Sequence, residues 1–171
     1  WLVAALNVLS EEGIEKVKVE YLAVYLNVTK GSFYWHFKDR DALLTQMVDF
    51  WEAAQNGVID RLETVVLEPK RRLWDLLQFI GRKDSRHDVA IRAWARTNSY
   101  AAKAIMRIDG RRLLFCENLF EQIGFAGDEG KLRARMVYYY QVGEYTVIKR
   151  DTTKLRLALV ERHYKLLTIK A

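Results

Sequence analysis

One proline, Pro69, stands in a chain of 171 residues, and nine glycines are its only other strong helix breakers. Because proline and glycine disfavour a helix interior more than other residues do, a chain this poor in them can form long helices. Apolar residues recur at the spacing of a helix face, and the alternation typical of a half-buried strand is missing. The sequence therefore predicts an all-α fold.

Start and stop signals divide this pattern into helices. Gly13 is a natural C-terminal stop, Thr29 and Asp39 can cap the helices that follow them, and Pro69 fits a first helical turn. The polar segment 81–88 predicts a loop. Helices are expected at about 1–12, 17–26, 29–35, 39–66, 69–81, 88–97, 100–124, 129–149 and 152–168, which gives a compact three-helix unit at 1–37 and then a larger bundle.

Composition places the chain among globular proteins. Half of the residues are hydrophobic and 29% are charged, as in a soluble protein with a sizeable core. A single cysteine, Cys116, excludes an internal disulfide and fits a reducing cytoplasm. No apolar run is long enough to span a bilayer, and the apolar opening 1–9 lacks the basic leader and cleavage site of a signal peptide. We expect a cytoplasmic protein without a membrane partner.

The charge of the chain favours a nucleic-acid partner only weakly. The formal net charge is +6, but residues 1–45 hold five Lys or Arg against six Asp or Glu, a net of −1. The basic excess lies at 131–171, where it is as readily explained by a solvated helix face.

The segment 28–37, V-T-K-G-S-F-Y-W-H-F, crowds four aromatic rings and a histidine behind a glycine. Two short helices joined by a tight turn, with another packed across them, form a helix-turn-helix, whose second member enters the DNA major groove. Val28, Phe33 and Phe37 are expected to face the core, which leaves Tyr34 and its polar neighbours to face outward. Lysine can neutralise phosphate, serine can bond base edges, and glycine lets the backbone approach DNA closely.

The stretch 12–44 closely resembles the DNA-binding domain of the TetR/AcrR family of bacterial transcriptional regulators. The resemblance rests on the Glu12-Gly13 turn, the Leu-Ala pair in the second helix, the pattern V-[ST]-x-G-[ST]-[LF]-Y-x-H-F at 28–37 and the start K-x-[KR]-x-x-L-L of the next helix. It implies a DNA-binding domain at 1–45 and a ligand-binding and dimerisation domain at 46–171. It also implies a homodimer on a palindromic site in double-stranded DNA, usually controlled by a small-molecule inducer.

Site residues are carried over from the family motif position by position. Trp35 could equally pack against the fourth or the first helix. Lys18 stands where the family usually has a capping Thr, Asn27 replaces the usual turn Gly, and Glu20 occupies a position that often faces DNA. The predicted DNA-binding residues are Thr29, Lys30, Gly31, Ser32, Tyr34, Trp35, His36, Lys38 and Arg40, of which Lys38 and Arg40 match positions that hold phosphate.

The larger part of the chain holds candidates for an effector pocket. Aromatic residues at helical spacing are typical of a hydrophobic core, but together they could also line an apolar cavity. A buried arginine among them would favour an acidic ligand, and His87 is expected to be solvated in its loop. The candidate ligand-binding residues are Trp74, Trp94, Arg96, Asn98, Arg107, Phe115 and Phe120.

The last two predicted helices carry apolar stripes that resemble the family's dimer interface, although a plain intramolecular core is the alternative. The arginines near these stripes are expected on solvated faces or in pairs at the rim. The stripes are Met136, Val137, Tyr140, Val147 and Ile148, and Leu155, Leu159, Val160, Tyr164 and Leu167; the arginines are Arg133, Arg135, Arg156 and Arg162.

Enzymatic activity is not expected. The histidines lie far apart without metal-ligand spacing, Cys116 has no neighbouring histidine, and no glycine-rich phosphate loop is present, so neither a metal nor a cofactor is predicted. We predict a ligand-responsive regulator, most simply a repressor. Two alternatives stay open: a DNA-bound scaffold of the same fold without ligand control, and a helical interaction protein without DNA affinity, which Glu20 and the net −1 of residues 1–45 favour.

Overall fold

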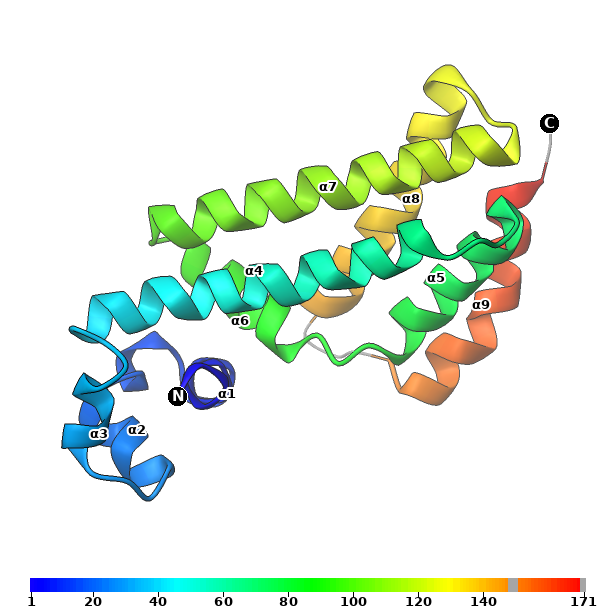
Figure 1. Cartoon of the computed structure of the whole chain (residues 1–171). Coiled ribbons are helices and arrows are strands. Elements are labelled where there is room, and N and C mark those ends of the chain that lie inside the picture. Colours follow the sequence, from blue (N-terminus) through cyan, green and yellow to red (C-terminus); the bar gives the residue numbers. More distant parts are fainter. Residues whose placement is uncertain (148–150, 170–171) are drawn as a thin grey trace. The chain divides into compact units, whose positions relative to one another are not determined.

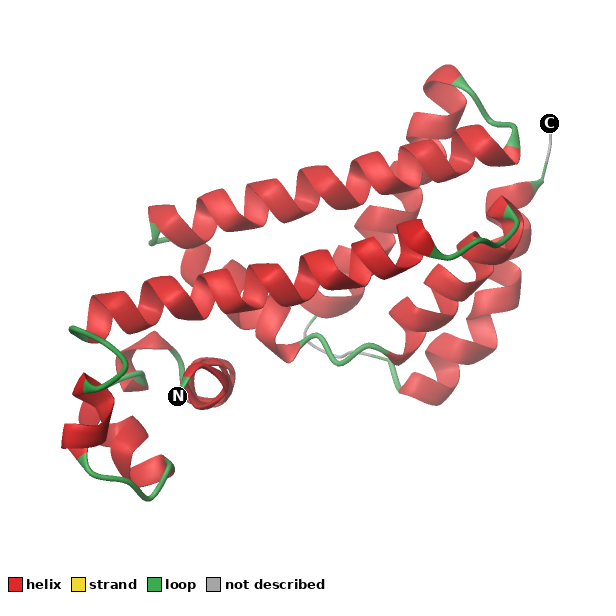
Figure 2. Ribbon diagram, viewed as in Figure 1, coloured by secondary structure: helices red, strands yellow, loops and turns green. Residues whose placement is uncertain are grey.

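A computed structural model of the chain describes residues 1–147 and 151–169, and every regular element in them is a helix (Figures 1 and 2). The predicted all-α fold is therefore confirmed. The elements are α1 (Leu2–Glu12), the 3-10 helix η1 (Ile14–Lys16), α2 (Val19–Tyr25), α3 (Lys30–Tyr34), α4 (Arg40–Thr64), α5 (Pro69–Arg82), α6 (Arg86–Ala95), α7 (Ser99–Ile123), α8 (Gly127–Thr146) and α9 (Thr153–Thr168).

The predicted start and stop signals act as expected. Gly13 follows α1 with a φ of 85°, a left-handed conformation that glycine adopts without strain. The Thr29 hydroxyl accepts a hydrogen bond from the Ser32 amide at 3.4 Å, and Asp39 Oδ1 accepts one from the Ala42 amide at 2.8 Å. Pro69 is the first residue of α5.

The predicted loop at 81–88 is wrong in its length. Only residues 83–85 lie between α5 and α6, and His87 belongs to α6 instead of a solvated loop. Polar residues of this stretch make tertiary hydrogen bonds: the His87 Nε2 atom lies 3.0 Å from Asn7 Oδ1, and Asp88 accepts a hydrogen bond from the Trp51 indole. Those contacts extend α6 toward its N-terminus although the local sequence is typical of a loop.

The chain forms two compact units. Unit 1 comprises Trp1–Gly57 and Ser85–Ile108, and unit 2 comprises Val58–Asp84 and Asp109–Ala171. Two of the three boundaries between these units fall inside α4 and α7, and the third falls in the loop between α5 and α6. The division of the chain into domains at 45/46 remains a prediction, since these units describe compactness and not independent folding.

Unit 1 is built around one hydrophobic core to which α1, α2, α3, α4, α6 and α7 all contribute. Phe33 of α3 and Leu22 of α2 are fully buried in it, as are Leu43 and Met47 of α4. Helix α1 packs against both α2 and α6. The short helices α2 and α3 therefore rest on the same core as α6.

Unit 2 has its own core, in which α5 packs along α9 (Figure 1). Cys116 is buried there, and burial raises the pKa of its thiol to about 12, which keeps it protonated and unreactive at neutral pH.

The expectation that the C-terminal arginines lie on solvated faces or in pairs at the rim is wrong for Arg156. Arg156 is only 7% exposed, and its guanidinium donates to the Gly81 and Asp151 carbonyl oxygens. The other three follow the prediction: Arg133 pairs with Glu129 at 2.6 Å, Arg135 pairs with Glu117 at 3.2 Å, and Arg162 is exposed. Arg133 also lies 3.9 Å over the Phe125 ring and donates to backbone oxygens at the end of α9.

The apolar stripes of α8 and α9 divide between the core and the surface. Val137, Val160 and Leu167 are buried in the core of unit 2. Ile148 lies outside the described residues. The stripe residues at the surface are Met136, Tyr140, Val147, Leu155 and Leu159, and their exposed neighbours are Leu132, Tyr139, Leu166 and Ile169.

None of the helices in residues 1–147 and 151–169 combines the length and the apolarity that crossing a membrane would require. In the same residues, no three His, Cys, Asp or Glu side chains gather where they could hold a metal ion.

Candidate nucleic-acid interface

The turn between α2 and α3 depends on one left-handed residue. Asn27 has a φ of 54°, a conformation that asparagine tolerates better than most residues do. The chain then folds back so that the Val28 amide donates to the Ala23 carbonyl oxygen at 2.9 Å. As the sequence indicates, Lys18 gives α2 no side-chain cap. Asn27 and the Thr29 cap together fix the direction in which α3 leaves the turn.

Helix α3 is anchored by Phe33. Its ring is fully buried, stacks edge-on against Trp1 with 5.3 Å between ring centroids, and lies 5.2 Å from the ring of Phe37. Val28, which was predicted to share this core, is 43% exposed. The prediction assumed helical spacing between Val28 and Phe33, but α3 begins only at Lys30, so Val28 belongs to the turn.

The three ring-bearing residues directly after Phe33 face outward. The Tyr34 side chain is 63% exposed, Trp35 is 88% exposed and His36 is also exposed. The alternative in which Trp35 packs against the first or the fourth helix is therefore wrong. Because α3 ends at Tyr34, Trp35 lies in the following turn and not on the buried face of the helix.

The polar residues of the motif surround these rings. Gly31 is exposed, and a Cβ atom added there would meet only the Thr29 hydroxyl, at an ordinary 3.6 Å. Packing within the chain therefore does not require a glycine at this position. Of the nine predicted DNA-binding residues, Ser32 and Arg40 are half-buried, and the exposed ones are Thr29, Lys30, Gly31, Tyr34, Trp35, His36 and Lys38.

Lys30 forms an ion pair with Glu20 across the two helices of the motif. Its Nζ atom lies 3.0 Å from Glu20 Oε1, and both side chains are more than half exposed. The hydrogen bond from Lys30 holds the pKa of the Glu20 carboxyl below its ordinary value. This ion pair links the charge of α3 to that of α2. The sequence did not indicate the pair, because Glu20 and Lys30 are ten positions apart.

Arg40 is engaged inside unit 1. Its Nε atom donates to the Val17 carbonyl oxygen at 2.6 Å, and Nη2 donates to the Ile14 carbonyl oxygen at 3.0 Å. These bonds tie the start of α4 to η1 and to the segment that leads into α2. The side chain that was predicted to hold phosphate therefore has a structural role of its own.

Four of the predicted ligand residues lie in unit 1. Trp94 lines a groove beside Leu9 and Ile14. Asn98 is a helix cap, since its Oδ1 atom accepts a hydrogen bond from the Ala101 amide at 2.9 Å.

A buried arginine among the predicted ligand residues would have favoured an acidic ligand. Neither Arg96 nor Arg107 is buried. Arg96 is exposed. Arg107 is also exposed, and its guanidinium forms two hydrogen bonds to the Glu52 carboxylate at 2.7 and 2.5 Å. Those bonds hold the pKa of Arg107 above its ordinary value.

The other three predicted ligand residues lie in unit 2, in different surroundings. Trp74 packs edge-on against Tyr164, with 5.5 Å between ring centroids, beside a shallow surface hollow. Phe115 lies in the core at the edge of a cavity of about 220 Å³. Phe120 is fully buried, so the core alternative holds for it.

Known proteins match this chain most specifically at its N-terminal end. Residues 2–47 match the family model described as bacterial regulatory proteins, tetR family. Over 102 residues the chain is 32% identical to the HTH-type transcriptional regulator AcrR of Shigella flexneri, an alignment that covers 46% of this chain and 45% of that protein. The chain thus spans about half the length of the curated relative that it matches. The similarity of this chain to the TetR/AcrR family is thus specific at residues 2–47.

Solved structures share the fold of the whole chain. A TetR transcription regulator from Haloarcula marismortui matches with a TM-score of 0.76 and 16% identity, over 98% of this chain and 93% of that chain. Salmonella enterica GusR matches with a TM-score of 0.73 and 15% identity, over 98% and 91%. Reduced E. coli NemR matches with a TM-score of 0.70 and 15% identity, over 98% and 91%. At these identities the likeness concerns the fold alone.

Two features of this chain were missed or misassigned by the predictions from its sequence. The resemblance assigned Arg40 to DNA without indicating its bonds to Ile14 and Val17. The groove beside Trp94 combines the end of α1 with α6, which are more than 70 residues apart in the chain. Only the tertiary fold brings those segments together.

Proposed function

We propose that this protein is a DNA-binding transcriptional regulator that binds a two-fold symmetric operator as a homodimer and acts as a repressor under the control of a small-molecule effector. The observation that supports DNA binding is the division of the aromatic cluster. Phe33 is buried as an anchor, whereas Tyr34 at the end of α3 and Trp35 and His36 in the turn after it are exposed. A recognition helix needs a buried residue that anchors it to the core and exposed side chains that can contact DNA.

The exposed groups suit both kinds of DNA contact. The Tyr34 hydroxyl and the His36 ring can donate hydrogen bonds to phosphate or base edges. Gly31 removes side-chain bulk where the backbone would come closest to the bases, and Lys38 is exposed to meet phosphate. We propose all nine residues of the motif as the contact region, with Arg40 acting mainly by holding α4 to the helices before it.

Homodimer formation is supported by the outer faces of α8 and α9. Met136, Tyr139 and Tyr140 of α8 are between 38% and 59% exposed, and Leu155 and Leu159 of α9 are 45% and 37% exposed. Exposed apolar residues on two antiparallel helices are typical of a four-helix bundle across a two-fold axis. Such a dimer would present two copies of α3 to one palindrome.

Effector control requires a ligand that prefers one conformation of the head, defined here as α1 to α3 with η1. Helix α4 begins directly after the head and is tied to it by Arg40. A change in the direction of α4 would therefore move α3. The DNA-bound scaffold without ligand control and the interaction protein without DNA affinity remain the competing functions.

The experiment that tests this function is selection from random duplex DNA with the protein, followed by anisotropy titration at two salt concentrations. A two-fold symmetric consensus is expected. Salt-sensitive binding without a consensus would support the scaffold. If no duplex is bound, extraction of bound small molecules distinguishes a regulator already held off DNA from the interaction protein.

Tyr34→Ala is expected to weaken operator binding by about 2 kcal/mol, because one hydrogen-bonding contact and its packing on the DNA would be lost. Anisotropy titration on the selected operator measures the change, and sedimentation confirms that the dimer is intact. Tyr25→Ala is the matched control, since Tyr25 is 47% exposed in α2 and lies outside the recognition segment. Equal losses in the two variants would remove Tyr34 from the contact region.

Glu20→Gln is expected to strengthen binding to random-sequence DNA and to steepen its salt dependence. The substitution removes a negative charge and frees Lys30 to meet a phosphate, so the slope of log Kobs against log salt should steepen by about 0.9. Glu15→Gln is the control, because it makes the same change of charge at an exposed residue of η1. If both variants change the slope equally, the Glu20–Lys30 pair does not restrain Lys30.

A further inference from the structure

The first turn of α6 is bound directly to α1 of the head and to α4. The His87 ring lies 3.0 Å from the Asn7 side chain of α1. One residue later, the buried Asp88 carboxylate accepts a hydrogen bond of 2.9 Å from the Trp51 indole of α4. Because these contacts fix one end of α6, a change in the spacing between α6 and α1 would have to occur farther along, over the following turns.

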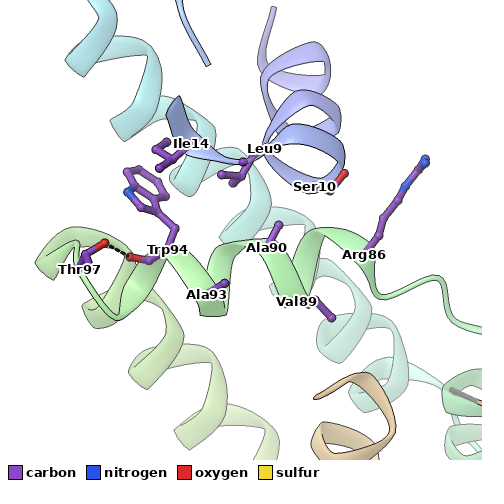
Figure 3. A pocket seen from close by; sticks show the side chains of 10 residues that line it. Leu9, Ser10, Ile14, Arg86, Val89, Ala90, Ala93, Trp94 and Thr97 are labelled. Atoms are coloured by element: carbon purple, nitrogen blue, oxygen red, sulfur yellow. Dashed lines mark hydrogen bonds between the residues drawn. The ribbon is translucent and has the colours of Figure 1, made fainter. Parts of the chain in front are cut away.

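A groove lies along those turns (Figure 3). It has a volume of about 550 Å³ and is formed by the end of α1, the segment through Gly13 and η1, and the outer face of α6. This volume lies within the range of about 300–1,000 Å³ that is usual for small-molecule sites. Its apolar wall consists of Leu9, Ile14, Val89, Ala90, Ala93 and the Trp94 indole.

The polar groups at the groove already have partners within the protein. The Ser10 hydroxyl donates to the Asn7 carbonyl oxygen at 2.8 Å, and the Thr97 hydroxyl donates to the Trp94 carbonyl oxygen at 3.2 Å (Figure 3). The charged side chain at its end, Arg86, lies 3.7 Å from the Glu11 carboxylate. An occupant is therefore not needed to satisfy a polar group, and a charged occupant would be desolvated against hydrocarbon without a partner of its own.

We propose that this groove binds a small, uncharged and largely apolar molecule, with an aromatic or hydrocarbon part against Trp94. The site is separate from the cavity beside Phe115 and from the hollow beside Trp74 in unit 2. The regulatory effect of binding at this groove rests on the proposed function. Leu9 and Ile14, which line the groove, belong to the head and pack in the core that holds Phe33. A ligand that fits one spacing of α1 and α6 better than another would bias the position of the head.

The test uses Nile red, an uncharged apolar dye whose fluorescence increases when it leaves water, with the full chain. Ala93→Phe fills the groove from an exposed position of α6, and Ala53→Phe, the matched control, makes the same change at an exposed position of α4. Ala93→Phe is expected to weaken the binding of the dye by about tenfold or more, a loss of about 1.4 kcal/mol. Ala53→Phe should bind like the original chain.

Hydrogen exchange locates the bound dye. Nile red is expected to slow exchange of the amides at 14–17 in the original chain and in Ala53→Phe, and to leave them unchanged in Ala93→Phe. If Ala93→Phe does not fold, Val89→Lys places a charge on the same wall and should give the same loss.

Equal binding of the dye by Ala93→Phe and Ala53→Phe, or protection confined to α8 and α9, would overturn the proposal. Neither measurement uses DNA, so a negative result here is distinct from a failure to find an operator.

Discussion

Arg40→Ala is expected to lower the free energy of unfolding by about 2–4 kcal/mol. The guanidinium makes two charged hydrogen bonds to the Ile14 and Val17 carbonyl oxygens, and a hydrogen bond to a charged group contributes about 1.5–3 kcal/mol. Arg40 is half-buried, so water can replace part of the loss, and the estimate lies below the sum of two such bonds. Denaturant unfolding monitored by circular dichroism at fixed protein concentration measures the change.

Lys38→Ala is the control, because Lys38 and Arg40 were both predicted to hold phosphate but only Arg40 is expected to stabilise the fold. Lys38 is exposed, so its loss should change stability by less than about 0.5 kcal/mol. It should weaken binding to all DNA sequences about equally and reduce the salt slope by about 0.9. If Arg40→Ala leaves stability unchanged and acts on DNA as Lys38→Ala does, the bonds from Arg40 to Ile14 and Val17 do not stabilise the head.

The helical fold could be predicted because its signals are local. Thr29 and Asp39 accept hydrogen bonds from amides three residues ahead, and Gly13 and Pro69 act on their own turns. Signals of this kind lie within one window of sequence. Where a helix end depended on distant partners the prediction was wrong, as at α6, where His87 contacts a residue 80 positions away.

The candidate DNA interface could be predicted in its composition but not in its internal contacts. The motif identified Tyr34 and His36, and both are exposed. It could not show that Lys30 is paired with Glu20 or that Val28 is in a turn, because each depends on where α3 begins and on how α2 is oriented. No sequence pattern indicated the groove beside Trp94, because its two walls come from segments that meet only in the folded chain.

Arg156→Ala is expected to cause the larger loss of stability, about 3–5 kcal/mol, because it breaks a buried charged network. Arg156 Nε donates to the Gly81 carbonyl oxygen at 3.1 Å, and Nη1 donates to the Asp151 carbonyl oxygen at 2.6 Å. The Glu144 carboxylate lies 3.9 Å away and is itself largely buried. Without the guanidinium, both carbonyl groups lose their donor, and a carboxylate stays in the core without its countercharge.

Arg162→Ala is the matched control, since Arg162 lies on the same helix but is exposed, and its loss should cost less than about 0.5 kcal/mol. A double-mutant cycle then separates the charge from the hydrogen bonds. Adding Glu144→Gln to Arg156→Ala should recover part of the lost stability, because it removes the uncompensated carboxylate, whereas Glu144→Gln alone should be destabilising. Strictly additive losses would mean that Arg156 acts only through its hydrogen bonds to the Gly81 and Asp151 carbonyl groups and to the Thr153 hydroxyl. Because α8 and α9 carry the proposed dimer face, the same variants also show whether that face depends on the buried network beneath it.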